Sequence, residues 1–382
     1  MPKQTSLLLD ILNRNNPAKR VLAARPTDRG LAEVPCFPLL AIVGQTEMKV
    51  ALILALINPH VGGVLLIGPR GTGKTTAVRG LIDLLPTVSR STCPYGCEPE
   101  AAYAHGFDAI CLSCAEKLGR GEAITAPDRM RLVELPLNAR LDDVIGGIDE
   151  RVALEQSRVH VERGLLAQSD QNVLYIDEVN LLDGSIVDAI LDAAAQGQYT
   201  VRRGPLAATY RARIALVGSM NPEEGTLRPQ IHDRFGLRVV VHGLPNEADR
   251  LEIYRRAQAY RLNPHALASD WAEETYSAAQ EIAEARECLP KVKLTRQVEK
   301  LGLGWIKRLK IDSHRTEITL FEAARAHAAA DSRTTVTTKD LRAVAPLALR
   351  QRRSAFMTEY FSQQSTEDKQ IRALVDNRAK RS

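Results

Sequence analysis

Aromatic residues are scarce in this sequence, since 2 Trp, 9 Tyr and 6 Phe make up 4% of its 382 residues. Proteins that hold single-stranded nucleic acids usually stack the bases on aromatic side chains, so this composition disfavours that class. Long apolar runs are also missing, because none approaches the roughly 20 residues that a membrane-spanning helix needs. The first residues lack the pattern of a secretory signal peptide. We therefore expect a cytoplasmic protein with no membrane insertion.

Neither sign of charge dominates the chain, which has 51 Lys and Arg against 46 Asp and Glu and a net charge of +5. Because this charge is spread along the sequence, it gives little support for a nucleic-acid partner. The 6 cysteines occur without a secretion signal, so we expect reduced thiols or metal ligands rather than disulfides. The length is sufficient for two or three globular domains.

A complete phosphate-binding loop, GPRGTGKTT, follows the apolar residues 64–67 and precedes a helical pattern. Glycines allow backbone N–H groups to converge on phosphate oxygens, and the start of the next helix favours negative charge. Lys74 would bind the β and γ phosphates, and the Thr75 hydroxyl would ligate Mg²⁺. An ordinary glycine-rich turn is the alternative. The expected nucleotide-binding residues are Gly68, Pro69, Arg70, Gly71, Thr72, Gly73, Lys74, Thr75 and Thr76.

An acidic pair follows a second buried strand, predicted at residues 173–176. Asp177 would hold Mg²⁺ through water, and Glu178 would orient the attacking water as a general base. A polar turn at a strand end is the alternative for this pair. Beyond a third strand at residues 214–217, Asn221 would lie beside the γ-phosphate, unless it only forms a turn before Pro222.

Arg234 precedes a further apolar strand, LRVVV. An arginine at a subunit edge can reach the γ-phosphate of a neighbour, as arginine fingers do. The alternative for Arg234 is a surface salt bridge with the adjacent Asp233.

Four of the six cysteines lie close together, as Cys93, Cys97, Cys111 and Cys114. Two close pairs separated by a loop resemble the spacing of a structural Zn²⁺ site. Such a site would hold together an insertion that has little apolar core. Free buried cysteines and an iron–sulfur cluster are the alternatives, and His105 is at most a substitute ligand. Cys36 and Cys288 have no partner in the sequence.

We expect a polar tail at residues 1–35 and an αβα nucleotide domain at residues 36–245, with the cysteine-rich insertion at 93–114. A hairpin is predicted to turn at Gly204-Pro205 within residues 199–214. Helical periodicity dominates residues 246–350, where Thr337 and Asp340 form a predicted capping box. Residues 351–382 read as a charged C-terminal tail.

The order of these motifs resembles that of the AAA+ ATPases. Three stretches, AIVGQTEMKVALILALINPHVGGVLLIGPRGTGKTT, LYIDEVNLLDGSIVDAILDAAAQG and NPEEGTLRPQIHDRFGL, look like the family of ATPase subunit I of magnesium chelatase. That family provides the motor that helps insert Mg²⁺ into protoporphyrin IX for chlorophyll or bacteriochlorophyll synthesis. The resemblance covers residues 34–350, and the last stretch is the most specific.

The resemblance implies an α/β fold, an AAA+ P-loop αβα nucleotide-binding domain with a C-terminal helical lid domain. It implies ATP and Mg²⁺ as cofactors, a homo-oligomeric ring that is a hexamer, and two partners, the integrin-like chelatase subunit and the porphyrin-binding chelatase subunit. Arg234 would be a finger acting on the adjacent subunit, and Arg315 a sensor in the lid, on a helix that Ser313 can cap. The implied catalytic residues are Lys74, Asp177, Glu178, Asn221, Arg234 and Arg315.

We therefore expect Mg²⁺-dependent ATP hydrolysis at a subunit interface, in the motor of magnesium chelatase. The alternative is a chelatase-like remodelling ATPase that works with a von Willebrand-type partner on another client. A nucleic-acid motor is disfavoured by the aromatic content and the mild charge. A non-enzymatic nucleotide-binding scaffold is disfavoured because Asp177, Glu178 and Arg234 are all present.

Overall fold

The computed structural model of this chain describes residues 34–147, 162–203 and 206–352. The chain forms two compact units, Met1–Pro35 and Cys36–Ser382. Only Val34 and Pro35 of the first unit are described. The expected N-terminal tail and C-terminal tail therefore lie almost entirely outside the described residues. Everything below concerns the unit that begins at Cys36.

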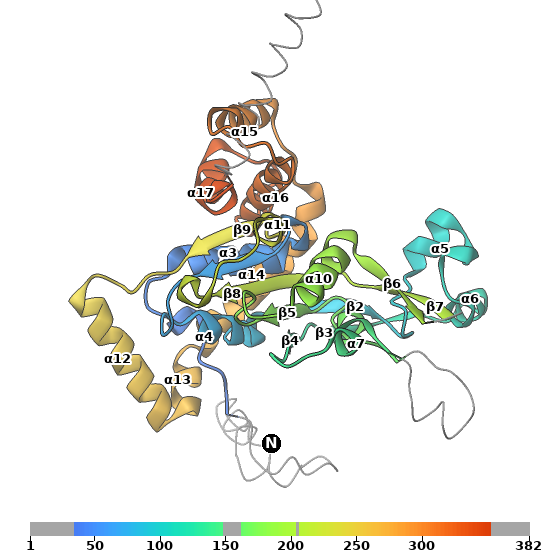
Figure 1. Ribbon diagram of the computed structural model, residues 1–382, viewed down its shortest axis with the longest axis horizontal. Helices are drawn as coiled ribbons and strands as arrows, with labels where there is room; N and C mark the ends of the chain where they lie inside the picture. The colour runs from blue at the N-terminus through green and yellow to red at the C-terminus, as the bar shows by residue number, and fades with distance from the viewer. Residues whose placement is uncertain (1–33, 148–161, 204–205, 353–382) are drawn as a thin grey trace, which may run out of the picture. The chain divides into compact units, whose positions relative to one another are not determined.

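A five-stranded parallel sheet forms the centre of this unit, in the order β4-β5-β8-β1-β9 (Figure 1). Strand β1 lies between β8 and β9, with Val64 paired to Val217 on one side and to Leu237 on the other. The strands predicted at residues 64–67 and 173–176 are confirmed. The bounds are β1 Val64–Ile67, β4 Leu132–Glu134, β5 Val173–Ile176, β8 Ala215–Met220 and β9 Leu237–Val240.

Both faces of the sheet are buried, because the central strands are continuous apolar runs. Val64 and Leu66 of β1 belong to one hydrophobic core, whereas Leu65 and Ile67 belong to another. The first core includes α3 Thr46–Ile57, α4 Lys74–Arg79 and α14 Ala272–Cys288. The second includes α7 Leu141–Ile145, α9 Leu165–Gln168, α10 Gly184–Gln196 and α11 Pro229–Arg234.

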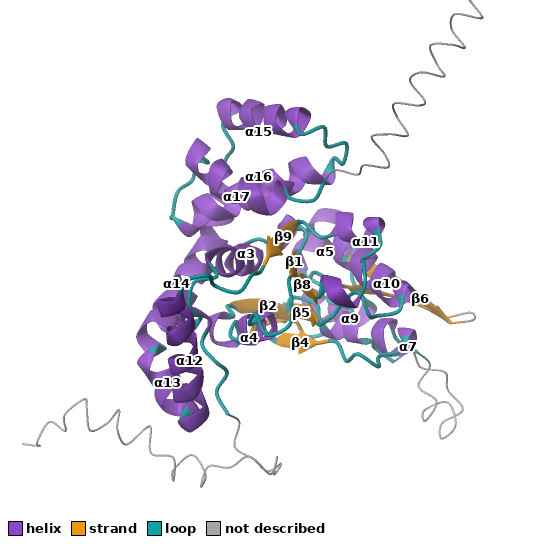
Figure 2. Ribbon diagram, turned by 60° about the vertical axis from the view of Figure 1, so that its left-hand side comes forward, coloured by secondary structure: helices purple, strands orange, loops and turns teal. Residues whose placement is uncertain are grey.

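A group of C-terminal helices extends the first core beyond the sheet. Figure 2 shows α16 and α17 lying together between α15 and α3. Helix α16 presents buried alanines, including Ala323 and Ala324, and such small side chains allow neighbouring helices to approach closely. The bounds are α12 Glu247–Leu262, α13 Pro264–Asp270, α15 Arg296–Arg308, α16 Arg315–Ala330 and α17 Thr338–Leu349.

Two antiparallel strand pairs form separate small sheets beside the five-stranded sheet. Strands β2 Thr87–Ser91 and β3 Thr125–Arg129 flank the cysteine insertion, which contains α5 Pro99–His105 and α6 Leu112–Gly119. Strands β6 Gln198–Arg203 and β7 Leu206–Arg211 form the predicted hairpin, which is thereby confirmed, although its turn residues lie outside the described part. Single 3₁₀ turns occupy Leu39–Ala41, Pro59–Val61, Ile82–Leu84, Phe107–Ala109, Pro222–Glu224 and Leu289–Lys291. Among the described helices, none has the length and apolar character needed to cross a membrane.

The predicted capping box at the start of α17 is confirmed and carries a buried charge. The Asp340 carboxylate accepts hydrogen bonds from Thr337 N, at 2.7 Å, and from Arg333 Nη1, at 2.8 Å. Its side chain is fully buried and lies 2.8 Å from His327 Nδ1. Burial alone would raise the pKa of Asp340, but the hydrogen bonds from Arg333 and Thr337 outweigh it and hold the pKa well below its usual range.

Replacing Asp340 by Asn should destabilise the protein by about 2 kcal/mol at neutral pH, because a hydrogen bond to a charged group is worth about 1.5–3 kcal/mol and the buried side chain would lose its charge. The folded-state pKa is depressed, so the stabilising contribution is present above the unfolded pKa of about 3.9 and is lost as the pH falls below it. Urea unfolding at pH 7 and at about pH 3.5 should therefore show a smaller difference between the two proteins at the lower pH.

The matched control is Asp331→Asn, since Asp331 contacts the same Arg333 from the surface, at 2.9 Å. This control should change the free energy of unfolding by about 1 kcal/mol or less. Equal losses in the two variants would contradict the assignment of Asp340 as the stabilising partner.

Candidate active site

The backbone of the phosphate loop requires glycine at three positions. Gly71 and Gly73 have φ angles of +75° and +84°, which residues with a side chain rarely adopt. A Cβ atom on Gly68 would lie 2.2 Å from the carbonyl oxygen of Val241 in the neighbouring segment. The loop therefore passes close to the end of β9 before α4 begins at Lys74, where the first backbone N–H groups of the helix can meet an anion.

Lys74 extends along the inside of the loop. Its Nζ donates to the carbonyl oxygens of Gly68, at 2.7 Å, and Pro69, at 2.8 Å. Burial lowers the pKa of Lys74, while Asp177 and Glu178 oppose that shift. The ammonium group is thus held at the position where phosphate oxygens would replace the loop carbonyls as acceptors.

The strand ends bring the predicted Mg²⁺ ligands together. Thr75 Oγ1 lies 3.3 Å from Asp177 Oδ2, and the Tyr175 hydroxyl donates to Asp177 Oδ1 at 2.8 Å. Ser219, at the end of the adjacent strand β8, donates to the same carboxylate and accepts from Glu178 N at 3.1 Å. Hydroxyl and carboxylate oxygens are the ligands that Mg²⁺ prefers, directly or through water, so this cluster can hold the metal of MgATP.

Glu178 and Asn221 stand beside this cluster. Glu178 has a φ angle of +49°, an uncommon conformation for a residue with a side chain, and its Oε1 lies 3.9 Å from Nε of Arg70. Asn221 is 3% exposed, and its Oδ1 accepts from Glu223 N at 3.2 Å. Asn221 therefore does form the turn at Pro222, and it also lines the same cavity as Lys74 and Asp177.

A cavity of about 220 Å³ joins these residues into one site. It is lined by Arg70, Gly71, Thr72, Gly73, Lys74, Thr75, Thr76, Asp177, Glu178, Ser219, Met220 and Asn221. A second cavity of about 360 Å³ adjoins the same loop at Gly71–Gly73 and Thr76 and is mainly apolar. Its other walls include Ile42, Val43, Leu244, Ile253 and Tyr260. A polar cavity beside an apolar one suits a phosphate chain joined to a nucleobase.

Known proteins are similar to this chain in sequence. The family model described as an AAA domain matches residues 60–219, and the model described as an AAA lid domain matches residues 307–374. A protein of Methanocaldococcus jannaschii named magnesium-chelatase subunit ChlI homolog is 43% identical over 84% of this chain and 87% of its own length. The magnesium-chelatase 38 kDa subunit of Acidiphilium rubrum is 42% identical over 83% of this chain and 90% of its own length.

This chain belongs to the magnesium-chelatase subunit I family. A solved structure, titled as the complex between subunits BchI and BchD of magnesium chelatase, has 39% sequence identity and a TM-score of 0.45 and covers 86% of this chain and 99% of that one. Members of this family are AAA+ ATPases, and the predicted fold class, an AAA+ α/β domain with a C-terminal helical lid, is confirmed.

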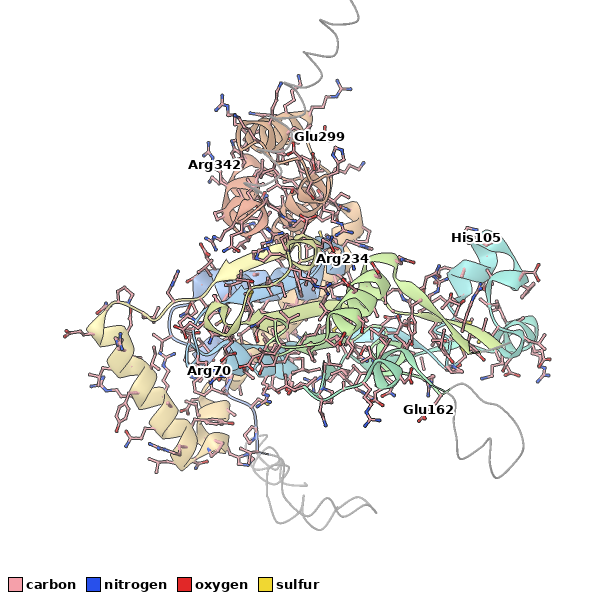
Figure 3. All side chains as sticks on the ribbon, viewed as in Figure 1. Arg70, His105, Glu162, Arg234, Glu299 and Arg342 are labelled. Atoms are coloured by element: carbon pink, nitrogen blue, oxygen red, sulfur yellow. The ribbon has the colours of Figure 1, made fainter. Side chains whose placement is uncertain are left out.

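Arg234 and Arg315 are predicted site residues of this family that the structure does not bring to the phosphate loop. Figure 3 shows Arg234 near the junction of α11 and α10, whereas Arg70 of the loop lies toward the other end of the sheet. Arg234 Nη1 lies 3.0 Å from an oxygen of Asp192 and 3.6 Å from one of Asp188, both on α10. The alternative that Arg234 forms a salt bridge with Asp233 is therefore wrong, since its partners are aspartates of α10.

Arg315 begins α16 and is exposed. The expected cap of this helix by Ser313 is wrong, because the N-cap residue is His314 and the Ser313 hydroxyl donates instead to Asp233 Oδ2, at 3.0 Å. This contact places the start of α16 beside α11.

Several residues of the site do not belong to any of the motifs that predicted it from the sequence. Tyr175 and Ser219 occupy apolar strands and were indistinguishable from core positions, although each lies two residues before a predicted site residue and so shares its face of the strand. Glu224 forms an ion pair with Arg70 at the mouth of the site. The apolar cavity could not be predicted from the spacing of residues along the sequence, because its walls come from segments about 200 residues apart.

The four clustered cysteines also meet in space. Their sulfur atoms all lie within 4.8 Å of one another, and the group does not include His105. The Cys97 sulfur accepts from Cys111 N at 3.3 Å, and the Cys93 sulfur accepts from Cys97 N at 3.5 Å. Burial opposes ionisation of Cys93, but hydrogen bonds from Ser91 and the backbone outweigh it and lower its pKa to about 7.

Replacing Ser219 by Ala should lower kcat for ATP about tenfold, because a hydrogen bond to a charged group is worth about 1.5–3 kcal/mol and the Asp177 carboxylate would lose one. ATP binding measured without Mg²⁺ should stay unchanged, since Ser219 contacts Asp177, which is expected to act only through the metal. The matched control is Ser185→Ala, whose exposed hydroxyl contacts only Asp183 among the described residues. Weakened Mg²⁺-free binding in Ser219→Ala would contradict this role.

Proposed function

We propose that this chain hydrolyses MgATP between neighbouring subunits of a ring, with catalytic groups contributed from both sides. One observation carries the proposal, namely that the candidate catalytic groups lie at two opposite edges of the parallel sheet. The phosphate loop follows β1 at its carboxyl end, whereas Arg234 precedes β9 at its amino end. Strands β1 and β9 are parallel and in register, from Val64 with Leu237 to Ile67 with Val240.

A strand of four residues spans about 13 Å, and the Arg234 side chain points away from the loop, toward α10. Arg234 therefore cannot serve the nucleotide of its own subunit in this arrangement. A second subunit that docks its carboxyl edge against this amino edge would place Arg234 at a bound γ-phosphate. Arg315 lies at the same amino edge through the Ser313–Asp233 contact, so we assign it, too, to the neighbouring nucleotide.

Within one nucleotide site, each residue then has a distinct task. Lys74 and the loop N–H groups neutralise the phosphates, while Thr75 and Asp177 hold the Mg²⁺ that accompanies ATP. Glu178 orients the attacking water as general base, and Asn221 places it beside the γ-phosphate. Arg234 of the adjacent subunit stabilises the charge that develops on the transferred phosphoryl group.

As a member of its family, the chain is the ATP-driven motor subunit of magnesium chelatase, in chlorophyll or bacteriochlorophyll synthesis. Its hydrolysis cycle drives Mg²⁺ insertion into protoporphyrin IX. The finer parts of this proposal are a hexameric ring, the integrin-like and porphyrin-binding chelatase subunits as partners, and a cytoplasmic location. We also keep the division into an ATPase domain at residues 36–245 and a lid at residues 246–350 as part of the proposal.

The second candidate function is a related remodelling ATPase that acts with a von Willebrand-type partner on another client. The cysteine insertion favours it, because that module adjoins the β6–β7 hairpin through Arg211 N, which donates to Tyr95 O at 3.1 Å. Exposed apolar side chains on the module, Tyr103, Phe107 and Leu112, are features of a surface that contacts another protein.

Reconstitution separates the two functions. The purified chain is mixed with the integrin-like and porphyrin-binding chelatase subunits, protoporphyrin IX, Mg²⁺ and ATP, and Mg-protoporphyrin fluorescence is followed. We expect product that depends on this chain and falls at least about 100-fold with Glu178→Gln, which removes the general base and leaves ATP binding intact.

The matched control is Glu223→Gln, an exposed carboxylate on the same edge, which should retain activity. Lys74→Ala should lose ATP binding itself. ATP hydrolysis without metal insertion, with cognate partners present, would favour the remodelling function, and full turnover in Glu178→Gln would exclude Glu178 as the base.

We further assign a structural Zn²⁺ ion to Cys93, Cys97, Cys111 and Cys114. Thiolate sulfurs at mutual distances up to 4.8 Å can converge on one tetrahedral ion with Zn–S bonds of about 2.3 Å. Backbone N–H groups already donate to two of these sulfurs, as they do to metal-bound thiolates. The module has few other apolar residues at its centre, chiefly Ala102, Ile110 and Ile124, so a metal would supply the stability that this small core lacks.

Metal analysis of the purified chain should find about one zinc ion per chain, the stoichiometry of a four-thiolate site. Cys114→Ser should lose most of this zinc, whereas Cys288→Ser, a lone cysteine in the helical region, should retain it. Absence of zinc from the unmodified protein would contradict the assignment, and iron with sulfide in its place would identify a cluster instead.

A further inference from the structure

The segment that follows helix α17 inserts a buried arginine into the corner between α11 and β9. The Arg352 side chain is fully buried, and its guanidinium donates to four backbone carbonyls and one carboxylate. The partners are Ala348 O at 3.1 Å, Asp233 O at 3.1 Å, Asp233 Oδ1 at 3.0 Å, Phe235 O at 3.2 Å and Gly236 O at 2.7 Å. This corner is the turn that immediately follows Arg234.

A second buried arginine also connects β9 with the segment after α17, but here the donor lies on β9. Arg238 of β9 is 1% exposed and donates to the carbonyl oxygens of Arg350, at 3.2 Å, and of His232, at 2.6 Å. The end of α17 and the start of β9 thus exchange hydrogen bonds through both arginines. The last carbonyl oxygens of a helix have no hydrogen-bond partner within the helix, and here the two arginine side chains donate to them.

Asp233 connects this corner to the second predicted arginine. Its Oδ1 accepts from Arg352, while its Oδ2 accepts from Ser313, two residues before Arg315. Arg234 is the next residue along α11. The segments that carry the two arginines assigned to the neighbouring nucleotide are therefore joined through the Asp233 carboxylate, which also accepts from Arg352.

We propose that Arg352 is a positioning residue for ATP hydrolysis in the adjacent subunit. It fixes the corner that carries Arg234 and, through Asp233, the start of the helix that carries Arg315. This inference rests on the proposed function, since it requires those arginines to act across the interface. A planar guanidinium can donate to several acceptors in fixed directions, whereas a lysine ammonium cannot match that fork. Displacement of a catalytic group by about 1 Å can cost about 100-fold in rate.

The test is complementation between two variants with opposite defects. Lys74→Ala subunits have no working phosphate loop but retain their arginines, and Arg352→Gln subunits have the opposite defect. Alone, Arg352→Gln should bind ATP within about twofold of wild type, while its kcat falls about 10–100-fold. Mixed in equal amounts, the two variants should recover about one quarter of wild-type activity, because half of the subunits offer a loop and half of their neighbours offer placed arginines.

Two reference proteins make the result specific. Arg234→Ala mixed with Lys74→Ala should recover activity in the same way. Arg342→Gln is the matched control, since Arg342 is an exposed arginine on the same helix α17, and it should remain active alone. If Arg352→Gln does not fold, Arg352→Lys keeps the charge and loses the fork, and the same loss of kcat and recovery by Lys74→Ala are expected of it.

Full kcat in Arg352→Lys would overturn the role of Arg352 and leave the proposed function intact. The same conclusion would follow if Lys74→Ala restored activity to Arg234→Ala but not to a folded Arg352 variant. Failure of both mixtures would instead refute action across the interface. Loss of ATP binding in a folded Arg352 variant would assign Arg352 to its own nucleotide site and also overturn the inference.

Discussion

The in-register parallel pairing of β5, β8, β1 and β9 is the constraint on which the rest of this structure depends. Because the strands run in one direction, everything that follows a strand lies at one edge of the sheet and everything that precedes one lies at the other. The phosphate loop, Asp177 and Asn221 all follow strands, so they meet although they are more than 40 residues apart. Apolar side chains on both faces keep this register, since a shifted strand would expose them.

The same pairing separates the arginines from the nucleotide site of their own subunit. Arg234 and the start of α16 both lie at the amino edge, and in the proposed ring each nucleotide site is complete only when two edges from different subunits face one another. A molecule built in this way couples hydrolysis to assembly, because any change in the angle between subunits moves the arginines relative to the phosphate. The lid is part of this edge, since Asp233 joins α11 to both Ser313 and Arg352.

Buried charges occur both within the helical region and where it meets the sheet. Arg238 and Arg352 lie at that contact and donate mainly to backbone carbonyls, whereas Asp340 is held within the helical region by Arg333, His327 and Thr337. Such networks are costly to break and specify one arrangement of helices. One hydrophobic core also runs from the sheet into α16 and α17, so the ATPase domain and the lid share apolar packing as well as ion pairs.

Local patterns in the sequence determined much of this protein. Glycine spacing specified the loop, apolar runs specified β1 and β5, and the capping box and hairpin followed from residues only a few positions apart. The tertiary structure alone decided that Arg234 pairs with α10 rather than Asp233, that Ser313 holds Asp233 rather than capping a helix, and that Tyr175 and Ser219 donate to the Asp177 carboxylate. The physical reason is range: turns and caps depend on neighbours in the chain, whereas these partners are set by the order and register of strands that no local pattern records.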